Sequence, residues 1–83
     1  MKESTLKSED IDNLYRNIGL NVKKYREEAG MTQLELSLSI GHKAVGTVST
    51  AELYINKKHF NIEQLAKIAN ALDKDIKVFF DSK

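Results

Sequence analysis

The chain has 83 residues, of which 41% are hydrophobic and 30% charged, enough for one domain with one modest core. It has no cysteine, which excludes disulfides and thiolate metal sites, and no proline and only four glycines, which favours helices over a turn-rich β fold. No apolar run approaches the roughly 20 residues that span a membrane, so we expect a cytoplasmic protein with no membrane segment.

The first predicted element is a long helix. Apolar residues recur at helical spacing for about five turns, at Ile11, Leu14, Tyr15, Ile18, Val22, Tyr25 and Ala29. Ser8 can cap the start of this helix, and Gly30 suits the left-handed position that ends one. Gly19 weakens the middle and could mark a kink or a break into two helices.

A short second helix is predicted from about residue 33 to 40. Thr32 and Glu35 match a capping box at its start, and Gly41 ends it. We expect its apolar side to consist of Leu34, Leu36 (or Ser37), Leu38 and Ile40.

A third helix is predicted from Ala44 or Val45 to Tyr54, with Val48, Ala51 and Ile55 facing inward. No capping side chain marks its start. Two short helices joined by a glycine turn are typical of a device that places the second helix in the DNA major groove.

The remaining elements follow a polar loop at residues 56–60. Asn61 and Gln64 match a second capping box, and the apolar residues after it have helical period up to Leu72. A last apolar segment, most simply a short helix, either closes the core or forms a dimer seam; it contains Ile76, Val78, Phe79 and Phe80.

Charge is unevenly distributed, although its net value is only +1. Between positions 42 and 60 one acid, Glu52, stands against three lysines and two histidines: Lys43, Lys57, Lys58, His42 and His59. Such clusters are often only solvated surface, but this one coincides with the third helix and the loop after it. A basic excess there favours an anionic partner.

The run Asn-Val-Lys-Lys-Tyr-Arg-Glu-Glu-Ala-Gly-Met-Thr-Gln-Leu-Glu-Leu-Ser at residues 21–37 resembles the start of phage-repressor-like (xenobiotic-response-element, Cro/repressor-type) helix-turn-helix domains. Leu-Ala-Lys-Ile-Ala-Asn-Ala-Leu at 65–72 resembles their fourth helix. The resemblance implies an all-α fold, a compact five-helix bundle of the lambda-repressor type at residues 13–83. A flexible or helical extension would precede it at residues 1–12.

The resemblance also implies site residues. Gln33 matches a phosphate-contacting glutamine, and Arg26 and Glu52 match a structural ion pair. The recognition positions would be His42, Lys43, Val45, Gly46, Thr47, Ser49 and Thr50, and the sugar-phosphate backbone would be lined by Lys57, Lys58, His59 and Asn61. The turn after Gly41 and the loop after Glu52 are longer than usual, and Ser37 replaces an alanine, so the contact register can shift by one residue.

Two functions remain open. The first is a transcriptional regulator, a dimeric repressor that binds an inverted repeat in double-stranded DNA through helix 45–54. The alternative is a protein-interaction module, such as an antitoxin. The two histidines stand alone without further ligands and no catalytic motif is recognisable, so we expect no metal, no cofactor and no enzymatic activity.

Overall fold

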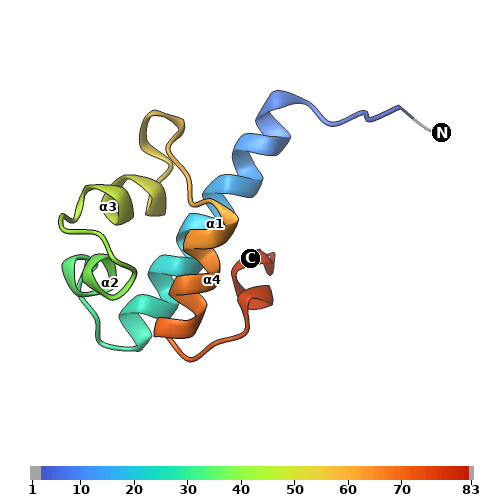
Figure 1. Cartoon of the computed structure of the whole chain (residues 1–83). Coiled ribbons are helices and arrows are strands. Elements are labelled where there is room, and N and C mark those ends of the chain that lie inside the picture. Colours follow the sequence, from blue (N-terminus) through green and yellow to red (C-terminus); the bar gives the residue numbers. More distant parts are fainter. Residues whose placement is uncertain (1–2, 83) are drawn as a thin grey trace.

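The computed structural model describes residues 3–82, and every regular element in that range is helical (Figure 1). The α-helices are α1 (Ser8–Glu28), α2 (Gln33–Ser39), α3 (Gly46–Glu52) and α4 (Ile62–Ala71). Two 3-10 segments, η1 (Ile55–Lys57) and η2 (Ile76–Phe80), complete the fold. The predicted all-α class is confirmed, but the element at the position of a fifth helix is a short 3-10 segment.

The long helix α1 is unbroken, so the alternative of two helices separated at Gly19 is wrong. A Cβ added to Gly19 would lie 2.5 Å from the carbonyl oxygen of Ala51 and 2.6 Å from that of Glu52. Gly19 is therefore the point where α1 touches the last turn of α3. Ser8 is not the cap: Lys7 precedes the helix, and its backbone N–H donates to the Asp10 carboxylate at 2.8 Å.

The core lies between α1, α2, α3, α4 and η2, and its centre consists of fully buried side chains: Val22, Leu36, Val48, Leu65, Ile68 and Phe79. Leu34 and Leu38 were predicted to face inward, but they are 47% and 57% exposed. Residues four apart share one side of a helix, and α2 buries the opposite side, which carries Leu36 and Ile40. A seven-residue helix with apolar residues at alternate positions cannot bury all of them.

The end of α3 also differs from the prediction. The chain turns into the left-handed region at Tyr54, where φ is 56°. The helical phase therefore stops at Leu53, and Tyr54 is buried in place of Ile55, which is 44% exposed. The prediction that Ile55 faces inward was wrong for this reason.

The two predicted capping boxes and the Gly30 helix end agree with the structure. The Thr32 hydroxyl accepts from the Glu35 N–H at 3.0 Å, and the Glu35 carboxylate accepts from the Thr32 N–H at 2.8 Å. Asn61 and Gln64 exchange the same pair of bonds at 2.7 and 2.9 Å. Gly30 has φ 71°, as the helix end requires. These capping predictions are confirmed.

The C-terminal segment η2 closes the core against α1. Phe79 is fully buried and packs edge-on against Tyr25, with ring centroids 6.1 Å apart. The Asn21 amide donates to the carbonyl oxygens of Phe79 and Asp81 at 2.9 and 2.8 Å. Phe80 points outward and is 48% exposed. Among residues 3–82, no helix is both long and apolar enough to cross a membrane.

Candidate nucleic-acid interface

Helices α2 and α3 form a pair joined by a turn that contains Gly41. The buried side of α3 consists of Val48, Ala51 and Glu52. Its opposite side is exposed or partly exposed and carries Gly46, Thr47, Ser49, Thr50 and Leu53. Because α3 begins at Gly46, the predicted contact residues His42, Lys43 and Val45 lie in the turn before the helix rather than on it.

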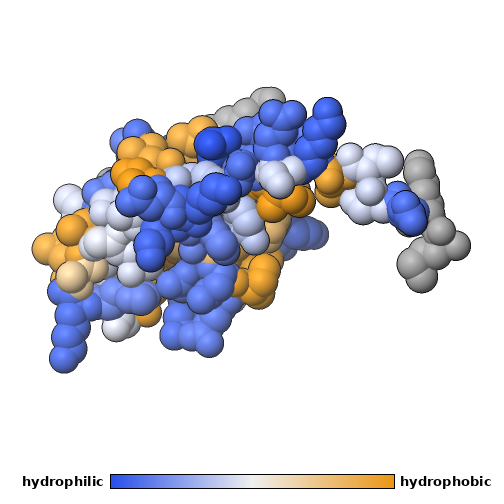
Figure 2. All heavy atoms as spheres, turned by 90° about the horizontal axis from the view of Figure 1, so that it is seen from above, coloured by the Kyte–Doolittle hydropathy of each residue, from blue (hydrophilic) through white to orange (hydrophobic). Residues whose placement is uncertain are grey.

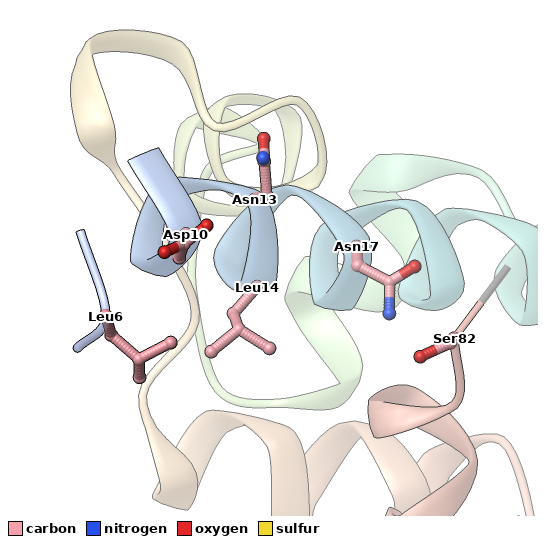
Figure 3. A pocket seen from close by; sticks show the side chains of 6 residues that line it. All are labelled: Leu6, Asp10, Asn13, Leu14, Asn17 and Ser82. Carbon is pink, nitrogen blue, oxygen red and sulfur yellow. The ribbon is translucent and has the colours of Figure 1, made fainter. Parts of the chain in front are cut away.

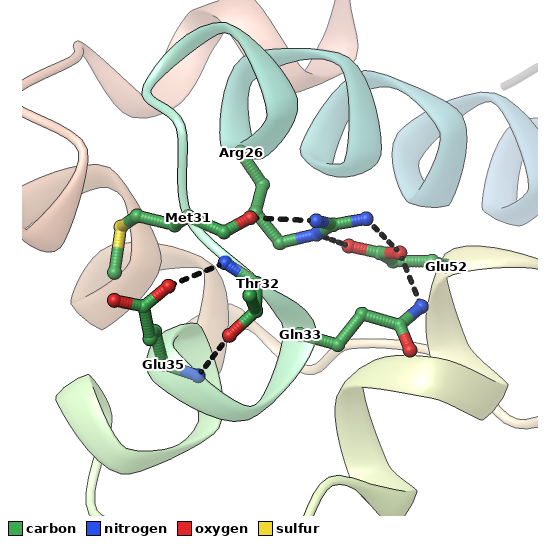
Figure 4. A network of polar contacts seen from close by, with 6 residues as sticks. All are labelled: Arg26, Met31, Thr32, Gln33, Glu35 and Glu52. Atoms are coloured by element: carbon green, nitrogen blue, oxygen red, sulfur yellow. Dashed lines mark hydrogen bonds and ion pairs between the residues drawn. The ribbon is translucent and has the colours of Figure 1, made fainter.

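A buried charge network fixes the position of α3 (Figure 4). The Arg26 guanidinium donates to both carboxylate oxygens of Glu52, from Nε at 2.7 Å and from Nη2 at 3.2 Å. Its Nη1 donates to the carbonyl oxygen of Met31 at 2.7 Å. The hydrogen bond to Glu52 raises the pKa of Arg26 above its ordinary value, so the guanidinium stays charged at any relevant pH. Arg26 and Glu52 thus join α1, α3 and the α1–α2 turn.

Gln33, the first residue of α2, belongs to the same network. Its Nε2 donates to Oε1 of Glu52 at 3.0 Å, while its side chain remains partly exposed. Figure 4 shows the side-chain oxygen of Gln33 directed away from Glu52. Glu52 therefore holds the Gln33 amide in one orientation at the start of α2. Sequence reasoning did not anticipate this bond, which spans 19 residues.

The hydroxyls of α3 are not equivalent. Ser49 and Thr50 both donate to the carbonyl oxygen of Gly46, at 3.2 and 2.8 Å. Their donors are satisfied within the helix, which leaves oxygen lone pairs and the Thr50 methyl group for a ligand. The Thr47 hydroxyl makes no hydrogen bond to any of residues 3–82, so it retains both donor and acceptor capacity.

A hollow of about 370 Å³ lies beside α3. One side is formed by α3 itself and the other by the loop that leads to α4, and its lining consists of Gly46, Thr47, Thr50, Ala51, Lys58 and His59. A Cβ at Gly46 would meet nothing within 4 Å, so no internal contact requires glycine there. The fold therefore brings part of the predicted backbone-contact loop to the exposed side of α3.

Two further residues predicted to contact the DNA backbone, Asn61 and Lys57, belong to the same loop but do not line the hollow. Asn61 is exposed, and its side-chain oxygen caps α4. Lys57 is exposed, with its backbone in the left-handed region at φ 61°. Within residues 3–82 there is no group of three or more His, Asp or Glu side chains that could hold a metal ion.

A family model described as helix-turn-helix matches residues 22–79, which is most of the chain. The chain belongs to the helix-turn-helix family of the XRE, Cro and lambda-repressor type. This is a family of DNA-binding regulators, which are usually not enzymes. No curated protein matches the chain.

The helix-turn-helix match begins at Val22, although α1 begins at Ser8. Residues 8–21, about two thirds of α1, therefore precede the matched region. This part of α1 carries Tyr15, whose ring stacks on that of His59 with centroids 3.8 Å apart and 19° between planes. The sequence marks Tyr15 only as one of the apolar residues at helical spacing, and no local signal connects it with His59, 44 residues away.

Proposed function

We propose that the protein is a dimeric repressor that docks α3 in the major groove of an inverted-repeat operator. The observation that supports this most is the free outer side of α3, which is flanked by the basic loop and held in place by the buried pair of Arg26 and Glu52. In helix-turn-helix domains, the second helix of the pair lies in the major groove of DNA in this way.

Phosphate contacts set the position of such a domain, and base contacts set its specificity. In the proposed complex Gln33, Lys57, Lys58 and Asn61 contact phosphates. Base edges are read by the residues around the start of α3, namely His42, Lys43, Val45, Gly46, Thr47, Ser49 and Thr50. The base-reading residues include no Arg, Asn or Gln, so we expect groove shape and bridging water to contribute to specificity.

The proposed dimer is supported by apolar side chains outside the core. Leu14 on α1 is 54% exposed, Ile62 on α4 is 67% exposed and Phe80 is 48% exposed. Leu6 and Leu14 both line a hollow between the start of the chain, α1 and Ser82 (Figure 3). In the view from above, several separate patches of apolar side chains lie on the otherwise polar surface (Figure 2). A second copy would cover such residues and double the contact with DNA.

The test of the proposed function is selection from random double-stranded oligonucleotides by the full chain, followed by a salt titration on the selected sequence. We expect an inverted repeat to be enriched, bound at two protomers per site. No enrichment at low salt would overturn the proposal. Light scattering of the free protein tests the dimer, and Leu14→Glu should lower the measured mass to that of one chain.

One observation favours protein interaction as the second candidate function. Leu34, Leu38 and Leu53, on α2 and at the end of α3, are 47%, 57% and 52% exposed. Leucines in these positions suit an apolar partner better than phosphate. If this candidate is correct, Leu34→Gln with Leu38→Gln abolishes partner binding, whereas a pure DNA binder keeps its selected sequence and its affinity.

A further inference from the structure

The loop between α3 and α4 has a strained backbone. Three residues without the freedom of glycine adopt left-handed conformations there: Tyr54, Asn56 and Lys57, with φ of 56°, 52° and 61°. This conformation is unfavourable for residues other than glycine, least so for asparagine, so contacts with the surroundings must hold the loop in this shape. Within the loop, the backbone supplies two hydrogen bonds, from the Lys57 N–H to the Tyr54 carbonyl at 3.3 Å and from the Lys58 N–H to the Ile55 carbonyl at 3.0 Å.

An aromatic cluster of Tyr15, Tyr54 and His59 fastens this loop to α1. Tyr15 lies 3.8 Å from His59 and 5.7 Å from Tyr54 between ring centroids, and both pairs are nearly parallel, at 19° and 21°. Stacked rings attract one another beyond the apolar area that they bury, so these pairs oppose separation of the loop from α1. Of the three rings, that of Tyr15 alone comes from α1, and it contacts both ends of the loop.

Polar groups on α1 reinforce the cluster. The Tyr54 hydroxyl donates to the Asp12 carboxylate at 2.7 Å, and this bond raises the pKa of Tyr54, which keeps the donor protonated. The Arg16 guanidinium lies 5.3 Å from the centre of the Tyr54 ring. One turn of α1 thus holds the entry to the loop through Tyr54 and its exit through His59.

His59 transmits this restraint to the lysines. Its Nδ1 lies 3.2 Å from the carbonyl oxygen of Lys57, so the tautomer with a proton on Nδ1 donates to that oxygen. His59 and Lys58 also line the hollow beside α3. A ring that stacks on Tyr15 and bonds to the Lys57 carbonyl restrains the backbone that carries both lysines.

We propose that Tyr15 is a positioning residue for DNA binding, which holds Lys57 and Lys58 beside α3 through its stack on His59. This inference rests on the proposed function. It assigns a role to a part of α1 outside the region that matches the family, and it makes His59 a loop anchor rather than primarily a phosphate ligand.

The test compares Tyr15→Ala, Tyr15→Phe and Leu20→Ala in the full chain, bound to the selected sequence over a range of salt concentrations. Leu20→Ala is the matched control, because Leu20 is 41% exposed on α1 and lies outside the aromatic cluster. Tyr15→Ala should weaken binding about tenfold, within the range of couplings between contacting residues. It should also lower the salt slope by roughly 0.9 for each phosphate that the loop no longer neutralises. Tyr15→Phe keeps the stack and should bind like the original chain.

A second arm asks whether Tyr15 acts through the lysines. In a background with Lys57→Ala and Lys58→Ala, Tyr15→Ala should have almost no further effect on affinity. Full additivity would overturn the proposal, and so would unchanged affinity and salt slope in a folded Tyr15→Ala variant. These results leave the proposed function intact if the original chain still binds its selected sequence.

Hydrogen exchange of the free protein provides a readout without DNA. Tyr15→Ala should accelerate exchange of the Lys57 and Lys58 amides while the amides of α4 stay protected. Equal protection in both proteins would overturn the inference even if DNA binding changed. If the original chain selects no sequence, the proposed function fails first, and the proposed role of Tyr15 in DNA binding fails with it.

Discussion

Two parts of the proposed interface are held by opposite means. The α2–α3 pair is fixed from inside, by a carboxylate with no exposed surface that bonds to Arg26 and Gln33. The loop after α3 is fixed from outside, by a cluster in which Tyr15 is partly exposed and His59 is exposed. The difference teaches that helix geometry here depends on charges removed from water, whereas the basic loop depends on contacts that can open without unfolding the core.

The largest effect is expected from the internal network. Glu52→Ala leaves the Arg26 guanidinium buried without its partner, and it should reduce the free energy of unfolding by about 3–5 kcal/mol. Urea denaturation measures this loss. Glu52→Gln keeps the shape and an acceptor, so it should lose less; an equal loss would mean that charge pairing, rather than the packing of the side chain, holds α3.

The contact of α1 with α3 should be the next most sensitive. Gly19→Ala places a Cβ within 2.6 Å of two backbone oxygens, which should destabilise the fold by roughly 1–3 kcal/mol. Gly46→Ala is the matched control, because a Cβ there meets open space. It should leave thermal unfolding nearly unchanged. If DNA approaches the α3 backbone closely, Gly46→Ala will nevertheless weaken binding.

The cap of α2 should contribute less. Thr32→Ala removes one side of the capping box and should cost about 1 kcal/mol. Hydrogen bonds from the Thr32 backbone and hydroxyl hold the pKa of Glu35 below its ordinary value of 4.5. The ionised carboxylate therefore stabilises the fold above pH 4.5, and this contribution is lost as pH falls through the lowered pKa. The difference between the two proteins in thermal unfolding should shrink over that acid range.

The smallest effect on stability is expected in the loop. Lys57→Ala with Lys58→Ala should change the free energy of unfolding by less than about 0.5 kcal/mol, yet lower the salt slope of DNA binding by nearly 2. Lys24→Ala with Lys74→Ala removes the same charge beside the Tyr25 ring, from which the two ammonium groups lie 5.1 and 5.5 Å. If this control lowers the slope equally, general charge rather than the loop determines binding.

Features that depend on residues close together in the sequence could be predicted, and those that depend on contacts between distant elements could not. Both capping boxes were predicted, because each needs only two residues three positions apart. The prediction of which α2 residues face inward was partly wrong. A short helix with alternating leucines offers two apolar sides, and which of them is buried depends on packing against α3.

The proposed site divides in the same way. The contact of Arg26 with Glu52 was inferred from a resemblance, whereas the bond from Gln33 to Glu52 and the stack of Tyr15 on His59 were not foreseen. Each joins residues from different elements and leaves no periodic trace in the sequence. The end of α3 at a left-handed Tyr54 was missed for the same reason.

The position of Phe79 has a consequence for synthesis. It fills the centre of the core against α1, and the Asn21 amide reaches the Phe79 carbonyl across 58 residues. On the ribosome, α1 emerges before the other elements of this domain, and the part of its apolar side that η2 covers stays exposed until residue 79 has left the exit tunnel. Stable folding of this domain should therefore begin only after its last core residue is available. Any shorter nascent chain exposes apolar side chains of α1 to which chaperones can bind.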